Sequence, residues 1–408
     1  MPDLSCRLCG GWRLEVFLSL GQLPLADAFV SAEDLGEPEP RYPLDVAFCL
    51  DCALVQILEE VPPQELFVDN YLYFSSYTDG LLAHSREHAE RLVEERGLGP
   101  DSLVVEVGSN DGYLLRSVAG AGVPVLGIDP APDQADEAER VGVPTVREFF
   151  GEEVARELRL QGRQADVIVA NNVMAHTPDL NGFAAGLARL LKHDGVATIE
   201  NPSVQDLIER CAFDTIYHEH FSYLSSTSVA ALMGRYSLTL NRVEEFPSLH
   251  GGTRRWWVSR DDTVEPSARD ALAREREAGV DRPDFYRAFG SRVSVLREQL
   301  MGVLGDLRRD GKRVAAYGAA AKGTTMLNAC GIGTDLVEYV VDRNPHKIGR
   351  LMPGTHQPIR PVETLLEDRP DAVLLLVWNI ADEVLAQQEA YRAAGGRFVV
   401  PVPEPRIV

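Results

Sequence analysis

The chain has 408 residues, which is enough for two or three domains of ordinary size. Its 62 acidic and 40 basic residues give a formal net charge of −22. A chain with this charge repels nucleic acid and anionic lipid surfaces, which excludes them as favoured partners. An anionic ligand must therefore be held in a local pocket. The longest apolar run, at 372–378, is far shorter than the about 20 residues that cross a bilayer. The N-terminus lacks the pattern of a signal peptide. We therefore expect a cytoplasmic protein that contacts neither a membrane nor nucleic acid.

Two cysteine pairs mark the first part of the chain. Cys6 and Cys9 are separated by two residues, as are Cys49 and Cys52, and this spacing turns both thiolates of a pair toward one tetrahedral metal ion. Four cysteines leave no position for a water molecule, so we predict a structural zinc site. The gap between the pairs is longer than in most zinc ribbons, and a redox pair is the alternative interpretation.

Strand and helix patterns then alternate along the chain. Apolar, β-branched runs predict strands at 103–107, 125–129, 143–146, 166–170, 195–200, 255–260, 313–317, 337–341, 372–377 and 398–402. Helices are predicted at 80–97, 111–119, 180–191 and 284–309 and after the small-residue turn that follows 313–317, while the charged stretch 261–282 is predicted to be an exposed connection. Alternation of this kind is typical of α/β folds with a parallel sheet. We divide the chain into a zinc-binding module at 1–75, an α/β core at 76–285 and a C-terminal α/β domain at 286–408.

A glycine turn follows the first of these strands, in the sequence VVEVGSNDG at 104–112. Glycine lets the backbone approach a ligand closely, and Asp129 ends the next strand, where a carboxylate can accept hydrogen bonds from ribose hydroxyls. Because the P-loop and the complete dinucleotide fingerprint are both absent, the turn favours a class I S-adenosylmethionine (SAM) methyltransferase, with a purely structural turn as the alternative. The residues expected to bind SAM are Glu106 (at the methionine ammonium), Gly108, Ser109, Asn110, Asp111, Gly112, Asp129, Phe149 and Phe150 (with Glu148 around the adenine), Asn171 and Asn172.

A polar and aromatic tract, DTIYHEHFSY at 214–223, follows in the same domain. Its His-x-His unit supplies only two metal ligands, so acid–base chemistry is favoured over a metal site. Histidine titrates near neutrality, and a tyrosine hydroxyl can donate to a developing enolate. An aromatic loop packed on the core is the alternative. The HGGT turn at 250–253 is a weaker candidate for the substrate pocket.

The C-terminal part carries a second small-residue turn, YGAAAKGTT at 317–325. Backbone N–H groups at a helix start favour phosphate, and Lys322 adds a positive charge. Asp342 follows the next strand and could contact a ribose or base, while Arg343 and Lys347 could meet a diphosphate. Only four lysines occur in the chain, and two of them lie in these segments. A packing turn beside a solvated charge run, or a degenerate SAM-like fold with a structural role, is the alternative.

The motifs occur in a distinctive order: two CxxC pairs, EVGSNDGYLL, NNVMAHTPDL, IENPSVQDL, IYHEHFSYLS, HGGTRRW and YGAAAKGTTMLN. In this combination the chain resembles, over almost its whole length, the nucleotide-sugar C-methyltransferases of deoxysugar biosynthesis. The resemblance implies a zinc module, a SAM-binding Rossmann-like core and a C-terminal Rossmann-like domain that helps to hold a nucleotide diphosphate. It implies methylation at carbon 3 of a dTDP-linked 4-keto-deoxysugar or at carbon 5 of a related sugar. We expect a monomer or a weak homo-oligomer.

The same resemblance aligns Tyr217, Glu219, His220 and His176 with catalytic residues and adds Tyr73 from the segment YLYFSS. Chemically, we expect His220 to remove the α-proton, oriented by Glu219 through its other ring nitrogen, with a tyrosinate as the alternative base. Tyr217 and His176 are expected at the enolate and keto oxygens. The residues expected to contact substrate are Tyr71, His218, Tyr223, Gly318, Lys322, Asp342, Arg343 and Lys347. An NAD-dependent sugar oxidoreductase, a zinc-containing scaffold and an O- or N-methyltransferase are the competing functions.

Overall fold

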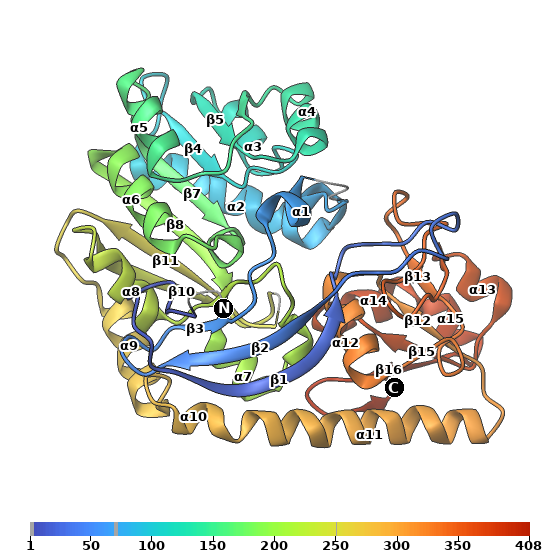
Figure 1. Ribbon diagram of the computed structural model, residues 1–408. Helices are drawn as coiled ribbons and strands as arrows, with labels where there is room; N and C mark the ends of the chain where they lie inside the picture. Colours follow the sequence, from blue (N-terminus) through green and yellow to red (C-terminus); the bar gives the residue numbers. More distant parts are fainter. Residues whose placement is uncertain (1–3, 69–71, 250) are drawn as a thin grey trace.

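The computed structural model describes residues 4–68, 72–249 and 251–408, and the strands within these ranges form three sheets (Figure 1). Tyr71 and His250 lie outside the described residues. No helix among the described residues is both long enough and apolar enough to cross a membrane.

The first sheet is antiparallel and has the order β1-β2-β3-β9, with β1 at Leu14–Pro24, β2 at Arg41–Cys49, β3 at Val55–Ile57 and β9 at Ser222–Tyr223. Its last strand therefore comes from the 214–223 tract. The long β1–β2 hairpin reaches toward the C-terminal sheet (Figure 1), and its buried Leu44 belongs to the same apolar core as Leu300 and Val314. The N-terminal sheet thus shares its core with the rest of the protein.

The second sheet has the order β6-β5-β4-β7-β8-β11-β10, and only β11 runs antiparallel to its neighbours. Its strands are β4 (Val104–Val107), β5 (Val125–Ile128), β6 (Thr145–Val146), β7 (Ala165–Asn171), β8 (Leu191–Pro202), β10 (Thr239–Phe246) and β11 (Thr253–Ser259). The helices of this part are α1 (Pro63–Phe67), α2 (Asp79–Arg96), α3 (Leu115–Gly120), α4 (Pro132–Arg140), α5 (Glu152–Leu160), α6 (Leu180–Leu190), α7 (Val204–Arg210), α8 (Ser226–Gly234) and α9 (Pro266–Ala278). Short 3-10 helices are η1 (Ser75–Tyr77), η2 (Met174–His176) and η3 (Phe213–Thr215). This strand order is that of a class I SAM methyltransferase, as expected.

The third sheet has the order β14-β13-β12-β15-β16-β17 and is parallel except for β17. Its strands are β12 (Val314–Tyr317), β13 (Val340–Asp342), β14 (Ile359–Pro361), β15 (Ala372–Leu375), β16 (Arg397–Val400) and β17 (Arg406–Ile407). The accompanying helices are α10 (Asp284–Arg287), α11 (Phe289–Arg309), α12 (Ala321–Cys330), α13 (Thr364–Asp368), η4 (Trp378–Ile380), α14 (Ala381–Gln387) and α15 (Glu389–Ala393). Helix α11 runs along one side of the molecule from the second sheet to the third (Figure 1).

Two of the sequence predictions are wrong in detail. The stretch 261–282 contains helix α9, which starts with Pro266 in its first turn and ends at the left-handed Gly279; its Ala268 and Ala271 are buried beneath a charged outer face, which masked the helix in the sequence. The helix expected at 111–119 begins only at Leu115, because Gly108, Asn110 and Gly112 have positive φ and form a turn first.

Candidate active site

One cavity of about 660 Å³ lies between the second and third sheets and takes lining residues from all three parts of the chain. The predicted site residues that line it are Tyr73, Gly108, Asn110, Asp129, Phe149, Phe150, Asn171, Asn172, His176, Tyr217, Glu219, His220, Gly318, Lys322, Asp342, Arg343 and Lys347. Predicted site residues that do not line it are Glu106, Ser109, Asp111, Gly112, His218 and Tyr223. Both small-residue turns therefore open into the same space.

The glycine turn after β4 is held by the buried carboxylate of Asp129. Its Oδ2 accepts the backbone N–H of Asn110 at 2.8 Å, and its Oδ1 accepts that of Ala131 at 2.9 Å. Burial raises the pKa of Asp129 to about 6, although these two backbone N–H groups oppose the shift. Each carboxylate oxygen retains acceptor capacity, so the residue can fix the turn and still contact a ribose.

The expectation for Glu106 needs correction. Its carboxylate is fully buried in β4 instead of lining the cavity, and burial raises its pKa well above the usual range. Tyr113, which the sequence analysis did not single out, does line the cavity, and the negative charges of Glu106 and Glu200 act with burial to raise the pKa of its phenol. At this wall Tyr113 lines the cavity and Glu106 does not.

A tyrosine–histidine pair forms the chemical centre of the cavity. The hydroxyl of Tyr217 lies 3.0 Å from Nε2 of His220, and Nδ1 of His220 lies 2.8 Å from the carbonyl oxygen of Thr215. A carbonyl oxygen only accepts, so Nδ1 carries a proton and donates to Thr215, while Nε2 faces the hydroxyl of Tyr217. The expectation that Glu219 orients His220 is wrong, because the Thr215 carbonyl occupies that position.

His176 lies beside this pair. Its ring meets the ring of His220 edge to face with centroids 4.7 Å apart, and Phe67 covers another side at 5.4 Å. Burial lowers the pKa of His176 well below its usual range, and the nearby His220 adds to the shift. His176 is therefore neutral at physiological pH and can donate an N–H without carrying charge.

Two charged side chains act on Glu219: Lys347, which the sequence suggested as a site residue, and Asp27, which it did not. Burial raises the pKa of Glu219 well above the usual range, the carboxylate of Asp27 adds to the shift, and Lys347 opposes it. Lys347 is only 6% exposed; its Nζ donates to the Ala319 carbonyl at 2.7 Å and lies 3.9 Å from Asp27. Lys347 thus neutralises buried carboxylates and is not freely available to a diphosphate.

The turn after β12 is built like the turn after β4. Oδ2 of Asp342 accepts the N–H of Ala319 at 2.7 Å, and its Oδ1 accepts the N–H of Asn344 at 2.7 Å. Lys322 Nζ donates to Asn379 at 2.9 Å at the wall of the cavity. The arrangement offers a ribose acceptor, free backbone N–H groups at the start of α12 and a cation to an anionic ligand.

Residues 72–79 connect the two turns. Asn110 accepts the N–H of Ser75 at 2.9 Å and donates to the carbonyl of Tyr73 at 3.2 Å. On the other side Asn344 donates to the carbonyl of Leu72 at 3.1 Å, and His346 stacks on Phe74 with centroids 5.5 Å apart. Backbone contacts of this kind leave no pattern in the sequence, which is why Asn344 was not anticipated.

His218 and Tyr223 are not among the residues that line the cavity, and both contact the N-terminal sheet. His218 Nε2 donates to the Pro43 carbonyl in β2 at 3.1 Å, and its ring meets Tyr42 edge to face. Tyr223 lies in β9, paired with Val55 of β3. Both residues attach the catalytic tract to the N-terminal sheet.

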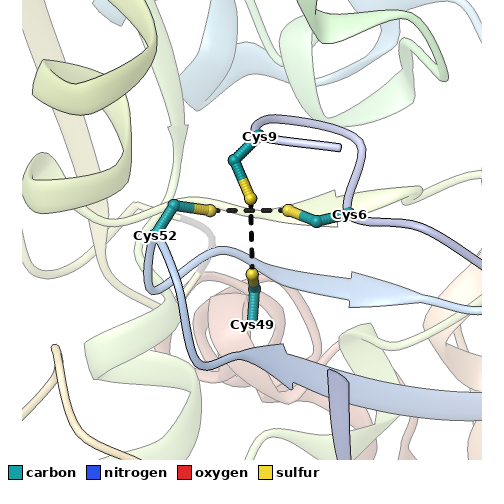
Figure 2. A group of neighbouring side chains, drawn as sticks. All are labelled: Cys6, Cys9, Cys49 and Cys52. Carbon is teal, nitrogen blue, oxygen red and sulfur yellow. Dashed lines mark hydrogen bonds between the residues drawn. The ribbon is translucent and has the colours of Figure 1, made fainter. Parts of the chain in front are cut away.

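The four paired cysteines converge as predicted. Their sulfur atoms all lie within 4.8 Å of one another, with Cys6 and Cys52 at 3.4 Å and Cys9 and Cys49 at 3.6 Å, and they point toward a common centre (Figure 2). These separations suit a tetrahedral ion with metal–sulfur bonds of about 2.3 Å. The cluster therefore fits structural zinc and lies apart from the residues that line the cavity.

Comparisons with known proteins agree with this organisation. Residues 6–67 match a family described as a zinc binding domain, residues 81–243 a methyltransferase domain, and residues 248–403 the C-methyltransferase C-terminal domain. C-methyltransferase NovU from Streptomyces niveus is 36% identical over 412 residues, covering 100% of this chain and 97% of NovU. A ubiquinone biosynthesis O-methyltransferase from Azorhizobium caulinodans is 27% identical over 128 residues, covering 30% of this chain and 47% of that enzyme. The crystal structure of magnesium protoporphyrin IX methyltransferase from Synechocystis with bound S-adenosylhomocysteine matches 45% of this chain and 84% of its own, with 16% identity and a TM-score of 0.36.

Proposed function

The chain belongs to the same family of SAM-dependent C-methyltransferases as NovU, and from this premise we propose that it methylates carbon 3, next to the keto group, of an NDP-4-keto-deoxysugar. A dTDP-linked hexose is the proposed substrate, and deoxysugar or natural-product biosynthesis is the proposed setting. Carbon 5 of a related nucleotide sugar is the second candidate. NAD-dependent sugar oxidation is disfavoured by the match to the methyltransferase family.

The observation that carries this proposal is the single cavity shared by two nucleotide-type turns. One wall is the Asp129 turn of the methyltransferase sheet, the other is the Asp342 turn beside Lys322, and the Tyr217–His220 pair lies between them in the lining. A ligand with a diphosphate at one end and a reactive sugar at the other matches this distribution of groups.

The proposed roles of the chain's residues follow from proton positions. SAM supplies an electrophilic methyl group when it is bound at the Asp129 turn. The Tyr217–His220 pair takes the α-proton of the sugar onto the Nε2 side of His220, directly or through the Tyr217 oxygen, and the Thr215 carbonyl stabilises the resulting imidazolium through Nδ1–H. Neutral His176 donates to the enolate oxygen, which lowers the cost of forming the carbanion. The enolate carbon would take the methyl group from the sulfonium of bound SAM as the carbon–sulfur bond breaks and S-adenosylhomocysteine leaves; this would restore the keto group, and His220 then passes its proton to water.

Turnover with a panel of dTDP- and GDP-linked 4-ketosugars tests the proposal. We expect a product one methylene heavier, with the new methyl group bonded to carbon 3 in carbon–proton correlation spectra. A methyl group on oxygen or nitrogen, or SAM binding with no turnover of any nucleotide sugar, would contradict it. Tyr217→Phe is the matched control: it removes one hydroxyl from the reacting pair and leaves the ring, so it should form the same product more slowly.

A further inference from the structure

Asp214 is a buried acid that the proposed chemistry does not use. It lies in η3 with no exposed surface, and its Oδ2 accepts the indole N–H of Trp378 at 2.7 Å. Neither Asp214 nor Trp378 is among the residues that line the cavity. A buried carboxylate is costly to desolvate, and a hydrogen bond from a neutral indole offsets only part of that cost. The contact between Asp214 and Trp378 therefore matters most for the groups that it holds in place.

On one side, Asp214 adjoins the group that orients the base. Thr215 is the next residue in the same 3-10 turn, and its carbonyl accepts the Nδ1–H of His220 at 2.8 Å. The turn is closed by the N–H of Ile216 donating to Phe213 at 3.0 Å. Because the turn is so short, a shift of the Asp214 side chain moves the Thr215 carbonyl and with it the ring of His220.

On the other side, Asp214 reaches the second small-residue turn. Trp378 begins η4, and its neighbour Asn379 accepts from Lys322 Nζ at 2.9 Å. The same ammonium lies 5.1 Å from the centroid of the Trp378 ring. Burial raises the pKa of Asp214 to about 6 while Lys322 opposes that shift, so the two side chains sense each other's charge. Asn379 and Lys322 both line the cavity.

We propose that Asp214 is a positioning residue: through its bond to Trp378 it ties the Thr215 carbonyl, and so the orientation of His220, to the Lys322 side of the cavity. The third sheet then does more than supply a subsite for the nucleotide, since its η4 turn fixes the geometry of the base in the segment between η3 and β9. The identity of the ligand at Lys322 rests on the proposed function; the link between Trp378 and His220 does not.

The first test needs no substrate. The Nδ1–H and Nε2 resonances of His220 are followed by nitrogen-15 NMR in the full-length protein, in Asp214→Ala and in Trp378→Phe. Trp378→Phe removes the donor and keeps a smaller aromatic ring near Lys322, and Asp214→Asn keeps an acceptor. We expect both Asp214→Ala and Trp378→Phe to shift the His220 resonances and its titration midpoint, with Asp214→Asn closer to wild type. Unchanged His220 signals in the folded variants would overturn the proposal, whatever the substrate is.

The second test measures α-proton exchange with deuterated water, and KM and kcat, on the nucleotide sugar that the panel identifies. We expect Trp378→Phe and Asp214→Ala to lower kcat and exchange by about 10- to 100-fold, as a displaced base does, with SAM affinity within about twofold. The double variant Asp214→Ala/Trp378→Phe should be no slower than either single variant, because both break one link. Additive losses would mean that the two residues act independently, and a lower Tm with unchanged kcat would mean that the contact serves stability alone; either result would overturn the proposal.

Discussion

Asp129 and Asp342 hold equivalent positions in the two α/β sheets. Asp129 directly follows β5, which neighbours β4, and Asp342 ends β13, which neighbours β12. Each carboxylate accepts one N–H from the turn after β4 or β12, from Asn110 or Ala319, and a second N–H from the residue two places after the aspartate. The four donor–acceptor distances are 2.8, 2.9, 2.7 and 2.7 Å. The same device thus prepares two turns that face each other across one cavity.

The first prediction tests whether the Asp129 turn and the Asp342 turn bind different ligands. Asp342→Ala should raise KM for the nucleotide sugar by about tenfold or more, because two hydrogen bonds to a charged acceptor, each contributing about 1.5–3 kcal/mol, are lost from the second turn. SAM affinity should stay within about twofold of wild type, since Asp342 does not touch the first turn. Calorimetric titration of both ligands checks this. Equal weakening of the two would mean that the turns are not independent sites.

The second prediction concerns pH. Asp129 has a pKa of about 6 and must be ionised to accept both backbone N–H groups with full strength. As the pH falls below 6 its carboxyl gains a proton, one oxygen becomes a donor, and the glycine turn loses a contact. We therefore expect SAM affinity to be constant above pH 7 and to fall by about tenfold per unit below pH 6. Asp129→Asn should bind SAM weakly and without this pH dependence; a flat wild-type profile from pH 5 to 8 would contradict the assignment.

The third prediction concerns the Tyr217–His220 pair. Tyr217→Phe removes the hydroxyl 3.0 Å from Nε2 and should lower kcat by about 10²–10³-fold, the range for an acid–base group or an oxyanion donor. SAM affinity should not change. Exchange of the α-proton with deuterated water, measured without SAM, distinguishes a lost base from a lost enolate donor. His220→Asn is the partner variant, and normal exchange in both would place the base elsewhere.

The sequence predicted the parts of the site that local patterns encode. The strand–turn at Val107 and Gly108 and the acid at Asp129 lie where alternating α/β patterns put them, because the carboxyl ends of parallel strands share one edge. The tract around His220 stands out by its residue types alone, and it lines the same cavity. The four cysteines converge, as the two-residue spacing within each pair predicts.

The parts that failed depend on contacts between distant segments. The orienting partner of His220 is a backbone carbonyl, which carries no residue-type signal. Asp27 joins the cavity from the connection between β1 and β2, far from Glu219 in the sequence. The two-residue strand β9 exists only because β3 is beside it, so His218 and Tyr223 could not be recognised as attachment points.

The fourth prediction uses the two lysines of the cavity as a matched pair. Lys347→Met should lower stability by about 3 kcal/mol, because the Ala319 carbonyl and the carboxylate of Asp27 lose their partner in a buried setting. Lys322→Met should mainly raise KM for the nucleotide sugar. Chemical denaturation and steady-state kinetics on both variants check this contrast. If Lys347→Met instead binds the nucleotide sugar much more weakly and keeps its stability, then Lys347 contacts the diphosphate.

The last prediction concerns zinc. The loop that carries Cys6 and Cys9 is held on helix α6 by Asn181, which donates to the carbonyls of Arg7 and Leu8 at 2.8 and 3.0 Å. Cys49 ends β2, and the sheet continues through β3 to β9, two residues after His220. Cys49→Ser should therefore lose zinc, lower Tm by at least about 5 °C, and speed hydrogen exchange at both 55–57 and 222–223. Because β9 adjoins the base, kcat should fall together with protection at 222–223, while Cys330→Ala, which alters a cysteine outside the cluster, should keep its zinc and its exchange pattern. Loss of zinc with protected β9 and unchanged kcat would show that the N-terminal sheet does not support the catalytic tract.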